Sequence, residues 1–159
     1  MQIKGLKDED FLNYSKPSMF IISSFCNFKC DKENGCAVCQ NSHLAHAPII
    51  EISIEKIIER YRNNDITKAI VWGGLEPFDT FDDLHDFIFE FRNCYSIKDD
   101  VVIYTGYNKD EIENELIQLK QFPNIIIKFG RYIPNSESHY DEILGVKLAS
   151  PNQYAERIS

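Results

Sequence analysis

The sequence predicts an α/β fold in which the strands of a parallel sheet alternate with helices in a barrel-like arrangement. Three observations predict it. Four short apolar runs are separated by segments whose apolar residues recur at helical spacing, and this alternation favours βαβ units. A segment rich in cysteine, glycine or tyrosine follows each run, as functional segments follow the carboxyl ends of strands in barrel-like folds. The length of 159 residues fits one domain, residues 1–159, with a sizeable core.

The first half of the chain supplies two strands and two helices. After a polar lead-in, residues 18–25 are short, β-branched and aromatic, which is typical of a buried strand. Residues 53–62 are predicted to form a helix, because Ser53 is a suitable N-cap and isoleucines recur at helical spacing. Residues 68–72 form the second predicted strand. Residues 80–91 form the second predicted helix, with acidic residues in its first turn that favour the helix dipole.

The second half repeats this unit. Strands are predicted at residues 101–104 and 124–129, and a helix at residues 109–120 connects them. Residues 134–159 have no clear period, and within them residues 145–154 are expected to form a hairpin or a lid.

The composition excludes several classes of protein. Hydrophobic residues make up 43% of the chain, and no apolar run approaches the roughly 18 residues that a membrane span needs. The formal charge of −8 argues against a nucleic-acid partner, which usually binds a basic surface. The first ten residues carry charges of both signs and no apolar core of a secretory signal, so we expect a cytoplasmic protein.

Four of the five cysteines lie in one short run, residues 26–41, directly after the first predicted strand. In a reducing compartment, clustered thiols more often bind metal or do chemistry than form disulfides. Thiolates are soft ligands that suit iron-sulfur clusters and zinc, and a four-iron cluster held by only three cysteines leaves one iron open. The fifth cysteine, Cys94, stands alone and is expected to be a buried helix residue.

The spacing of these cysteines resembles the Cys-x3-Cys-x2-Cys signature of the radical S-adenosylmethionine (SAM) superfamily. Cys26 and Cys30 fit the first two positions, and Cys39-Gln40-Asn41 looks like the third position of its small activase subfamily. Eight residues rather than two separate Cys30 from Cys39. We interpret residues 31–36 as an insertion, which makes Cys26, Cys30 and Cys39 the expected cluster ligands and Cys36 the alternative ligand.

Two further segments carry the resemblance. Gly73-Gly74-Leu75-Glu76-Pro77 is similar to the Gly-Gly-Glu-Pro element of the superfamily, in which glycine backbone and a carboxylate approach the ammonium group of the ligand. Tyr104-Thr105-Gly106-Tyr107 looks like a segment of the activating protein of anaerobic ribonucleotide reductase. Looser likenesses are Gly130-Arg131-Tyr132 and the late residues Asn152, Gln153 and Arg157. The expected cofactor-binding residues are Gly73, Gly74, Glu76, Thr105 and Tyr107.

This resemblance implies an incomplete parallel (βα) barrel of the radical SAM type that carries a 4Fe-4S cluster and SAM. It implies that SAM is cleaved reductively to a 5′-deoxyadenosyl radical. That radical would generate a glycyl radical on a protein partner, an anaerobic ribonucleotide reductase. A flavodoxin or ferredoxin-type protein would donate the electron, and no residue beyond those above is assigned to catalysis.

Two alternative functions remain open at this point. One is a radical SAM enzyme that acts on another peptide or on a small molecule. The other is a binding module stabilised by zinc on Cys26, Cys30, Cys36 and Cys39, which leaves the glycine motifs unexplained.

The roles of several polar residues are also open. His43 and His46 are expected in a solvent-facing loop, with metal ligation as the alternative. Lys128 and Arg131 face either a ligand or water. Either Tyr104 or Tyr107 is expected to line the cofactor site, and an aromatic packed in the core is the alternative.

Overall fold

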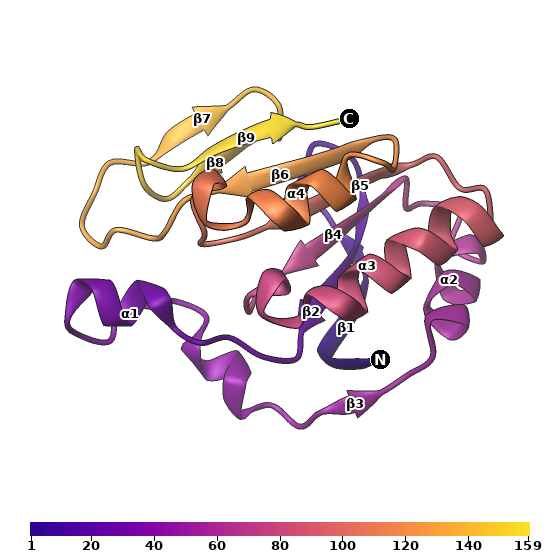
Figure 1. The fold of residues 1–159 in the computed structure, drawn as a ribbon, viewed down its shortest axis with the longest axis horizontal. Coiled ribbons are helices and arrows are strands. Elements are labelled where there is room, and N and C mark those ends of the chain that lie inside the picture. The colour runs from indigo at the N-terminus through magenta and orange to yellow at the C-terminus, as the bar shows by residue number, and fades with distance from the viewer.

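The computed structural model describes residues 1–159 and is built on a seven-stranded mixed sheet (Figure 1). The strands are β1 (Gln2–Asp10), β2 (Ser18–Ser23), β3 (Ile50–Glu51), β4 (Ala69–Gly73), β5 (Asp100–Tyr104), β6 (Ile125–Phe129), β7 (His139–Asp141), β8 (Val146–Leu148) and β9 (Tyr154–Arg157). The α-helices are α1 (Lys29–Asn34), α2 (Ile54–Arg62), α3 (Phe81–Phe89) and α4 (Glu113–Leu119). Short 3₁₀ helices are η1 (Ser42–His46), η2 (Pro77–Thr80) and η4 (Lys109–Glu111), and η3 (Glu90–Cys94) is a π-helical turn.

The order of the strands explains where the helices lie. The sheet runs β3-β1-β2-β4-β5-β6-β9, and its four central strands, β2, β4, β5 and β6, are parallel. The four parallel strands follow one another across the sheet in chain order. Right-handed crossovers between them therefore place α2, α3 and α4 on the same face of the sheet. The strands β1 and β9 flank the parallel set in antiparallel orientation. The predicted α/β fold is confirmed as a mixed, mostly parallel sheet, and the strands do not close into a complete barrel.

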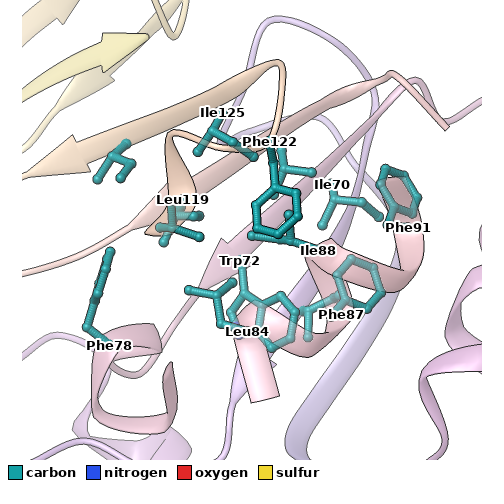
Figure 2. Packing of buried hydrophobic residues seen from close by; sticks show 14 of the residues in the cluster. Ile70, Trp72, Phe78, Leu84, Phe87, Ile88, Phe91, Leu119, Phe122 and Ile125 are labelled. Carbon is teal, nitrogen blue, oxygen red and sulfur yellow. The ribbon is translucent and has the colours of Figure 1, made fainter. Parts of the chain in front are cut away.

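The helices bury the larger core against one face of the sheet (Figure 2). Ile70 and Trp72 of β4 project from the sheet and meet Phe87 and Ile88 of α3. The rings of Trp72 and Phe87 pack edge to face with centroids 5.2 Å apart. Burying each such side chain stabilises the fold by about 1.5–3 kcal/mol, which accounts for the mostly apolar sequences of the central strands.

The opposite, concave face carries a second core that fills only part of it. Val71, Val102 and Ile126 of three neighbouring strands pack with Tyr14 from the β1–β2 loop and Leu144 from the β7–β8 hairpin. The loop and the hairpin are joined directly, because the backbone N–H of Ser15 donates to the carbonyl of Leu144 at 2.8 Å. The end of the concave face beyond this core, at the carboxyl ends of the parallel strands, remains available for a site.

Two local expectations were wrong. The polar lead-in is the nine-residue strand β1, which its charged residues hid: only Ile3 and Asp10 of this strand are buried. Cys94 is exposed. The π-helical turn after α3 changes the helical register, so that Phe91 and Arg92 face the protein interior and Cys94 faces solvent.

The remaining elements agree with the sequence or shift by a few residues. The Ser53 side chain accepts the backbone N–H of Lys56 at 3.3 Å and caps α2 as expected. The expected helix at residues 109–120 divides into η4 and α4. The hairpin of this region is β7–β8, residues 139–148, so residues 145–154 do not form the expected hairpin: they contain β8 and the turn that leads into β9, which pairs with β6. No helix of the structure combines the length and the apolar character needed to cross a membrane.

Candidate functional site

A cavity of about 430 Å³ lies at the carboxyl ends of the parallel strands β2, β4, β5 and β6. It is the site towards which the cysteine and glycine motifs converge. Residues from the expected site that line it are Cys26, Cys30, Cys39, Gly74, Glu76 and Thr105. A larger surface depression of about 760 Å³ between β1 and α2 contains none of the cysteines.

The cysteine loop folds so that its last cysteine returns to the cavity. Phe28, with a positive φ of 56°, turns the chain into α1, and Gly35, with φ of 67°, ends that helix. The Asp31 carboxylate then accepts the backbone N–H groups of Val38 and Cys39 on one oxygen, both at 2.8 Å. These two bonds close the loop formed by the inserted residues 31–36 on the protein surface. Cys39 therefore lies at the same cavity as Cys26 and Cys30.

Cys36 lies outside the cavity. It is exposed, and its thiol lies 3.6 Å from the carbonyl oxygen of Asn34. His43 and His46 are exposed on η1, as expected for a solvent-facing loop. No three His, Cys, Asp or Glu side chains lie close enough together to hold a single metal ion. The thiols that line the cavity instead surround a space, which suits a cluster in which each thiolate binds a different iron.

Two of the cavity thiols, Cys26 and Cys39, have a pKa above that of an ordinary cysteine. Burial raises the pKa of Cys26 to about 12, and the nearby carboxylates of Glu76 and Asp79 act in the same direction. Burial also raises the pKa of Cys39. Binding of iron by these side chains would therefore release protons, as ligation of a metal by a thiol normally does.

Glu76 joins the motif after β4 to the motif after β5. One carboxylate oxygen accepts the Thr105 hydroxyl at 2.7 Å and the backbone N–H of Phe78 at 3.2 Å, and the other accepts the backbone N–H of Gly106 at 2.9 Å. The side chain is 8% exposed. Burial raises its pKa to about 7, although the three hydrogen bonds oppose this shift. Glu76 is thus a buried carboxyl group on the cavity wall with a fixed orientation.

Close packing favours glycine at two positions of these motifs. Gly74 has a φ of 76°, and a Cβ atom there would lie 2.9 Å from a methyl group of Ile22. A Cβ atom on Gly106 would lie 3.3 Å from the thiol sulfur of Cys30. These positions let the backbone approach the cavity and the cysteine.

Two of the expected cofactor-binding residues do not line the cavity. Gly73 packs under Tyr104, which does line it. The Tyr107 hydroxyl donates to Asp79 at 2.7 Å, and Asp79 also accepts the backbone N–H of Asn27 at 2.6 Å. Tyr107 therefore supports the start of the cysteine loop from behind.

The two basic residues near the end of β6 differ in their surroundings. Lys128 is buried and lines the cavity. Arg131 is buried outside the lining and forms a two-bond ion pair with Glu111 of η4, at 2.6 and 2.7 Å. It also pairs with Glu33 of α1 at 2.9 Å. Arg131 thereby attaches the cysteine loop to the body of the protein.

Other lining residues had no signal in the sequence. Asn13 comes from the β1–β2 loop, and Lys147, Leu148 and Ala149 come from β8 and the residue after it. They reach the cavity only because the loop and the hairpin pack together on the concave face. Gln153 also lines it, within the segment that resembles the end of the activating protein.

Comparison with known protein families gives one match. The family described as 4Fe-4S single cluster domain matches residues 18–150, from β2 to just beyond β8. This stretch contains all the cavity cysteines and supports an iron-sulfur protein. Neither the curated proteins nor the solved structures gave a significant match. The soft thiols around one cavity fit the cluster that the matched family is named for.

Proposed function

Since this chain belongs to the family of 4Fe-4S single cluster domains, which is found in radical SAM-type proteins, we propose that it is a radical SAM enzyme. The observation that carries the proposal is the shared cavity: Cys26, Cys30 and Cys39 line it together with Glu76, while Cys36 is exposed outside it. Three thiol ligands leave one iron of a four-iron cluster without a protein ligand. A sheet with α2, α3 and α4 on one face is compatible with the incomplete barrel expected of this superfamily.

The residues around the cavity have separable roles in this proposal. Cys26, Cys30 and Cys39 would hold the cluster. Such a cluster supplies, when bound, one electron to the sulfonium of SAM, which breaks a carbon–sulfur bond and yields methionine and a 5′-deoxyadenosyl radical. The Glu76 carboxylate would accept a hydrogen bond from the ammonium group of SAM. The absence of a side chain at Gly74 lets the ligand approach the backbone.

We further propose that the target is a glycyl-radical protein, an anaerobic ribonucleotide reductase, with a flavodoxin or ferredoxin-type electron donor. The Tyr104-Thr105-Gly106-Tyr107 segment supports this, because it bears the likeness to the activating protein and lies at the cavity. Exposed residues, among them Gln40, Asn41 and Lys147, border the cavity, so it opens to solvent. A docked protein segment can therefore reach it.

The first experiment is anaerobic reconstitution with iron and sulfide, followed by EPR spectroscopy of the reduced protein with and without SAM. We expect the signal of a reduced four-iron cluster, and a change in that signal when SAM is added. A protein that binds stoichiometric zinc and no cluster would overturn the proposal in favour of a structural zinc module. A cluster signal that is indifferent to SAM would remove the SAM chemistry and leave an iron-sulfur protein.

A second experiment tests the target. The reduced, SAM-loaded protein is incubated with an anaerobic ribonucleotide reductase from the same source, and EPR is used to look for a radical on the reductase. A glycyl radical that requires both SAM and the cluster is the expected result. SAM cleavage without transfer of a radical would favour another peptide or a small molecule as the substrate.

A further inference from the structure

Lys128 is a buried cation on the cavity wall that the proposed function has not used. It lies on the concave side of β6, opposite Tyr104 of β5 and Ala155 of β9 in the strand register. The residue is only 6% exposed, yet it belongs to the lining of the cavity. Burying a charged lysine costs free energy unless hydrogen bonds or an opposite charge compensate for the lost hydration.

The protein itself satisfies this ammonium group only in part. Its Nζ donates to the carbonyl oxygens of Gly130 at 2.8 Å and Thr105 at 3.3 Å. An ammonium group has three N–H donors, so these bonds leave one donor open. No carboxylate lies within ion-pair distance of it, since the ion pairs of the structure involve other lysines and arginines. Burial lowers the pKa of Lys128 to about 8, with Glu76 and Cys30 opposing the shift, so the group stays largely protonated at pH 7.

Glu76, in the same cavity, has an unfilled position for accepting a hydrogen bond. A carboxylate has about four acceptor positions, and the protein fills three of them through Thr105, Phe78 and Gly106. The wall therefore presents one open acceptor on a carboxylate and one open donor on an ammonium group. These two side chains are not paired with each other, although the charge of Glu76 acts to raise the pKa of Lys128.

We propose that Lys128 binds the carboxylate of an amino-acid-type ligand whose ammonium group is bound by Glu76. The inference rests on the proposed function, in which that ligand is the methionyl end of SAM. A zwitterion matches a site with one charge of each sign. A phosphate dianion does not, because the Glu76 carboxylate would repel it and Lys128 is the only buried cation of the lining.

The test compares SAM with decarboxylated SAM, which lacks only the carboxylate in question. The Kd of each is measured by anaerobic titration of the reconstituted wild-type protein, with affinity normalised to the cluster content of each preparation. The ratio of the two Kd values isolates the contribution of the carboxylate. The same ratio is then measured for Lys128→Met, which removes the charge and keeps the length of the side chain.

We expect the wild type to prefer SAM, and Lys128→Met to reduce this preference by about tenfold or more, the usual effect of one charge-assisted hydrogen bond. Lys128→Gln is the second variant, because its amide can still donate to the carbonyls of Gly130 and Thr105 and so keeps the strand ends supported if Lys128→Met does not fold. Lys147→Met is the matched control: this exposed lysine stands at the edge of the same cavity, and its loss should leave the ratio unchanged.

The outcomes separate this inference from the function on which it rests. Wild-type protein that loads a cluster and does not bind SAM overturns both. SAM binding with the same preference in the wild type and in a folded Lys128 variant overturns the role of Lys128 and leaves the proposed function standing. An equal loss of preference in Lys147→Met would show a general charge effect and would also overturn the assignment to Lys128.

Discussion

One carboxylate determines the path of the cysteine loop. Asp31 accepts two backbone N–H groups eight and seven residues later in the chain, those of Cys39 and Val38. The loop between them is exposed, so these bonds are the main restraint that brings Cys39 to the cavity. A loop that is closed in this way tolerates extra residues, because lengthening a surface loop costs little free energy once its ends are fixed.

The first prediction concerns this carboxylate. Asp31→Ala should leave the two N–H groups without their acceptor and allow Cys39 to move away from the cavity. We expect the reconstituted variant to retain less than half of the iron of the wild type, with little change in melting temperature because the loop lies outside both cores. Lys32→Ala, at the neighbouring exposed position, should retain full iron content. Equal iron in Asp31→Ala and the wild type would contradict the role of Asp31.

The second prediction distinguishes Cys36 from Cys39, the two cysteines at the end of the cysteine loop. Cys39→Ala should lose the cluster, because it removes a thiol from the cavity lining, whereas Cys36→Ala should retain most of the iron. Iron and sulfide analysis together with the visible absorption of the cluster measure the difference. Equal losses in the two variants would mean that the extra residues rearrange when iron binds and that the proposed ligand set is wrong.

The third prediction concerns the buried carboxylate on the wall. Glu76→Ala should weaken the binding of SAM by about 10- to 100-fold, the range expected from the loss of one charge-assisted hydrogen bond, while the cluster remains. Titration of the reconstituted variant with SAM measures the affinity, and its iron content is the control. Unchanged affinity would remove Glu76 from the binding site.

The residue scale also shows how far the sequence alone could lead. Cys26, Cys30, Glu76 and Thr105 could be placed at one site because each follows a predicted strand. The function of Asp31 could not be predicted, because its partners depend on the conformation of an irregular loop. The same holds for the open donor of Lys128, since burial and missing partners are properties of the folded chain.

At the scale of elements, a network of charged side chains joins the short helix α1 to the rest of the fold. Lys29 and Glu33 of α1 pair with Glu111 and Arg131 respectively, and Arg131 and Glu111 pair with each other. The hydrogen bonds of Arg131 hold the pKa of Glu111 far below its usual range, and Lys29 adds to this effect. No residue of α1 is buried, so this network, rather than apolar packing, positions the helix that carries Cys30.

The fourth prediction follows from this network. Arg131→Met should loosen α1, because it removes the ion pair with Glu33 and the two-bond pair with Glu111 at once. Amide exchange of residues 29–34 should become faster by about tenfold, a size expected for hydrogen bonds between charged groups. Arg60→Met breaks a surface ion pair between Arg60 of α2 and Asp8 of β1, and it should leave that exchange unchanged. Unchanged exchange in Arg131→Met would show that the network does not hold the helix.

The elements differ in how well their sequences predicted them. The central strands β4 and β6 are buried on both faces, so each is a short, mostly apolar run that stands out from its surroundings, with Lys128 of β6 as the charged exception. The strand β1 pairs on both sides too, but it lies towards the edge of the sheet and carries charged residues along most of its length. Its identity depends on pairing with β2 and β3, which no local pattern reveals.

At the scale of the whole molecule, Asp100 joins the parts that close the concave face. It lies at the start of β5 and is only 5% exposed. Its carboxylate accepts the Tyr14 hydroxyl and the Lys16 ammonium from the β1–β2 loop, and the Arg157 guanidinium from β9. Three segments far apart in the sequence thus meet on one side chain, at the end of the sheet opposite the cavity.

The fifth prediction concerns the stability that this arrangement gives. Burial by itself would raise the pKa of Asp100, but the hydrogen bonds from Lys16, Arg157 and Tyr14 outweigh it and hold the pKa below its ordinary value of 3.8. A carboxyl group whose pKa is lowered by folding stabilises the native state above its unfolded pKa, and this contribution is lost as the pH falls through the folded pKa. Asp100→Asn should therefore reduce the free energy of unfolding by about 1–3 kcal/mol at pH 7.

Urea denaturation of the metal-free protein between pH 7 and pH 3 tests this prediction directly. The difference between the wild type and Asp100→Asn should be largest near neutral pH and should shrink as the pH falls below about 4, because the wild-type carboxyl group then becomes neutral as well. Asp86→Asn, which changes an exposed aspartate of α3, should match the wild type at neutral pH. A difference that stays constant over this range would assign the effect to packing of the side chain rather than to its charge, and the carboxylate would not be what holds the loop and β9 to the sheet.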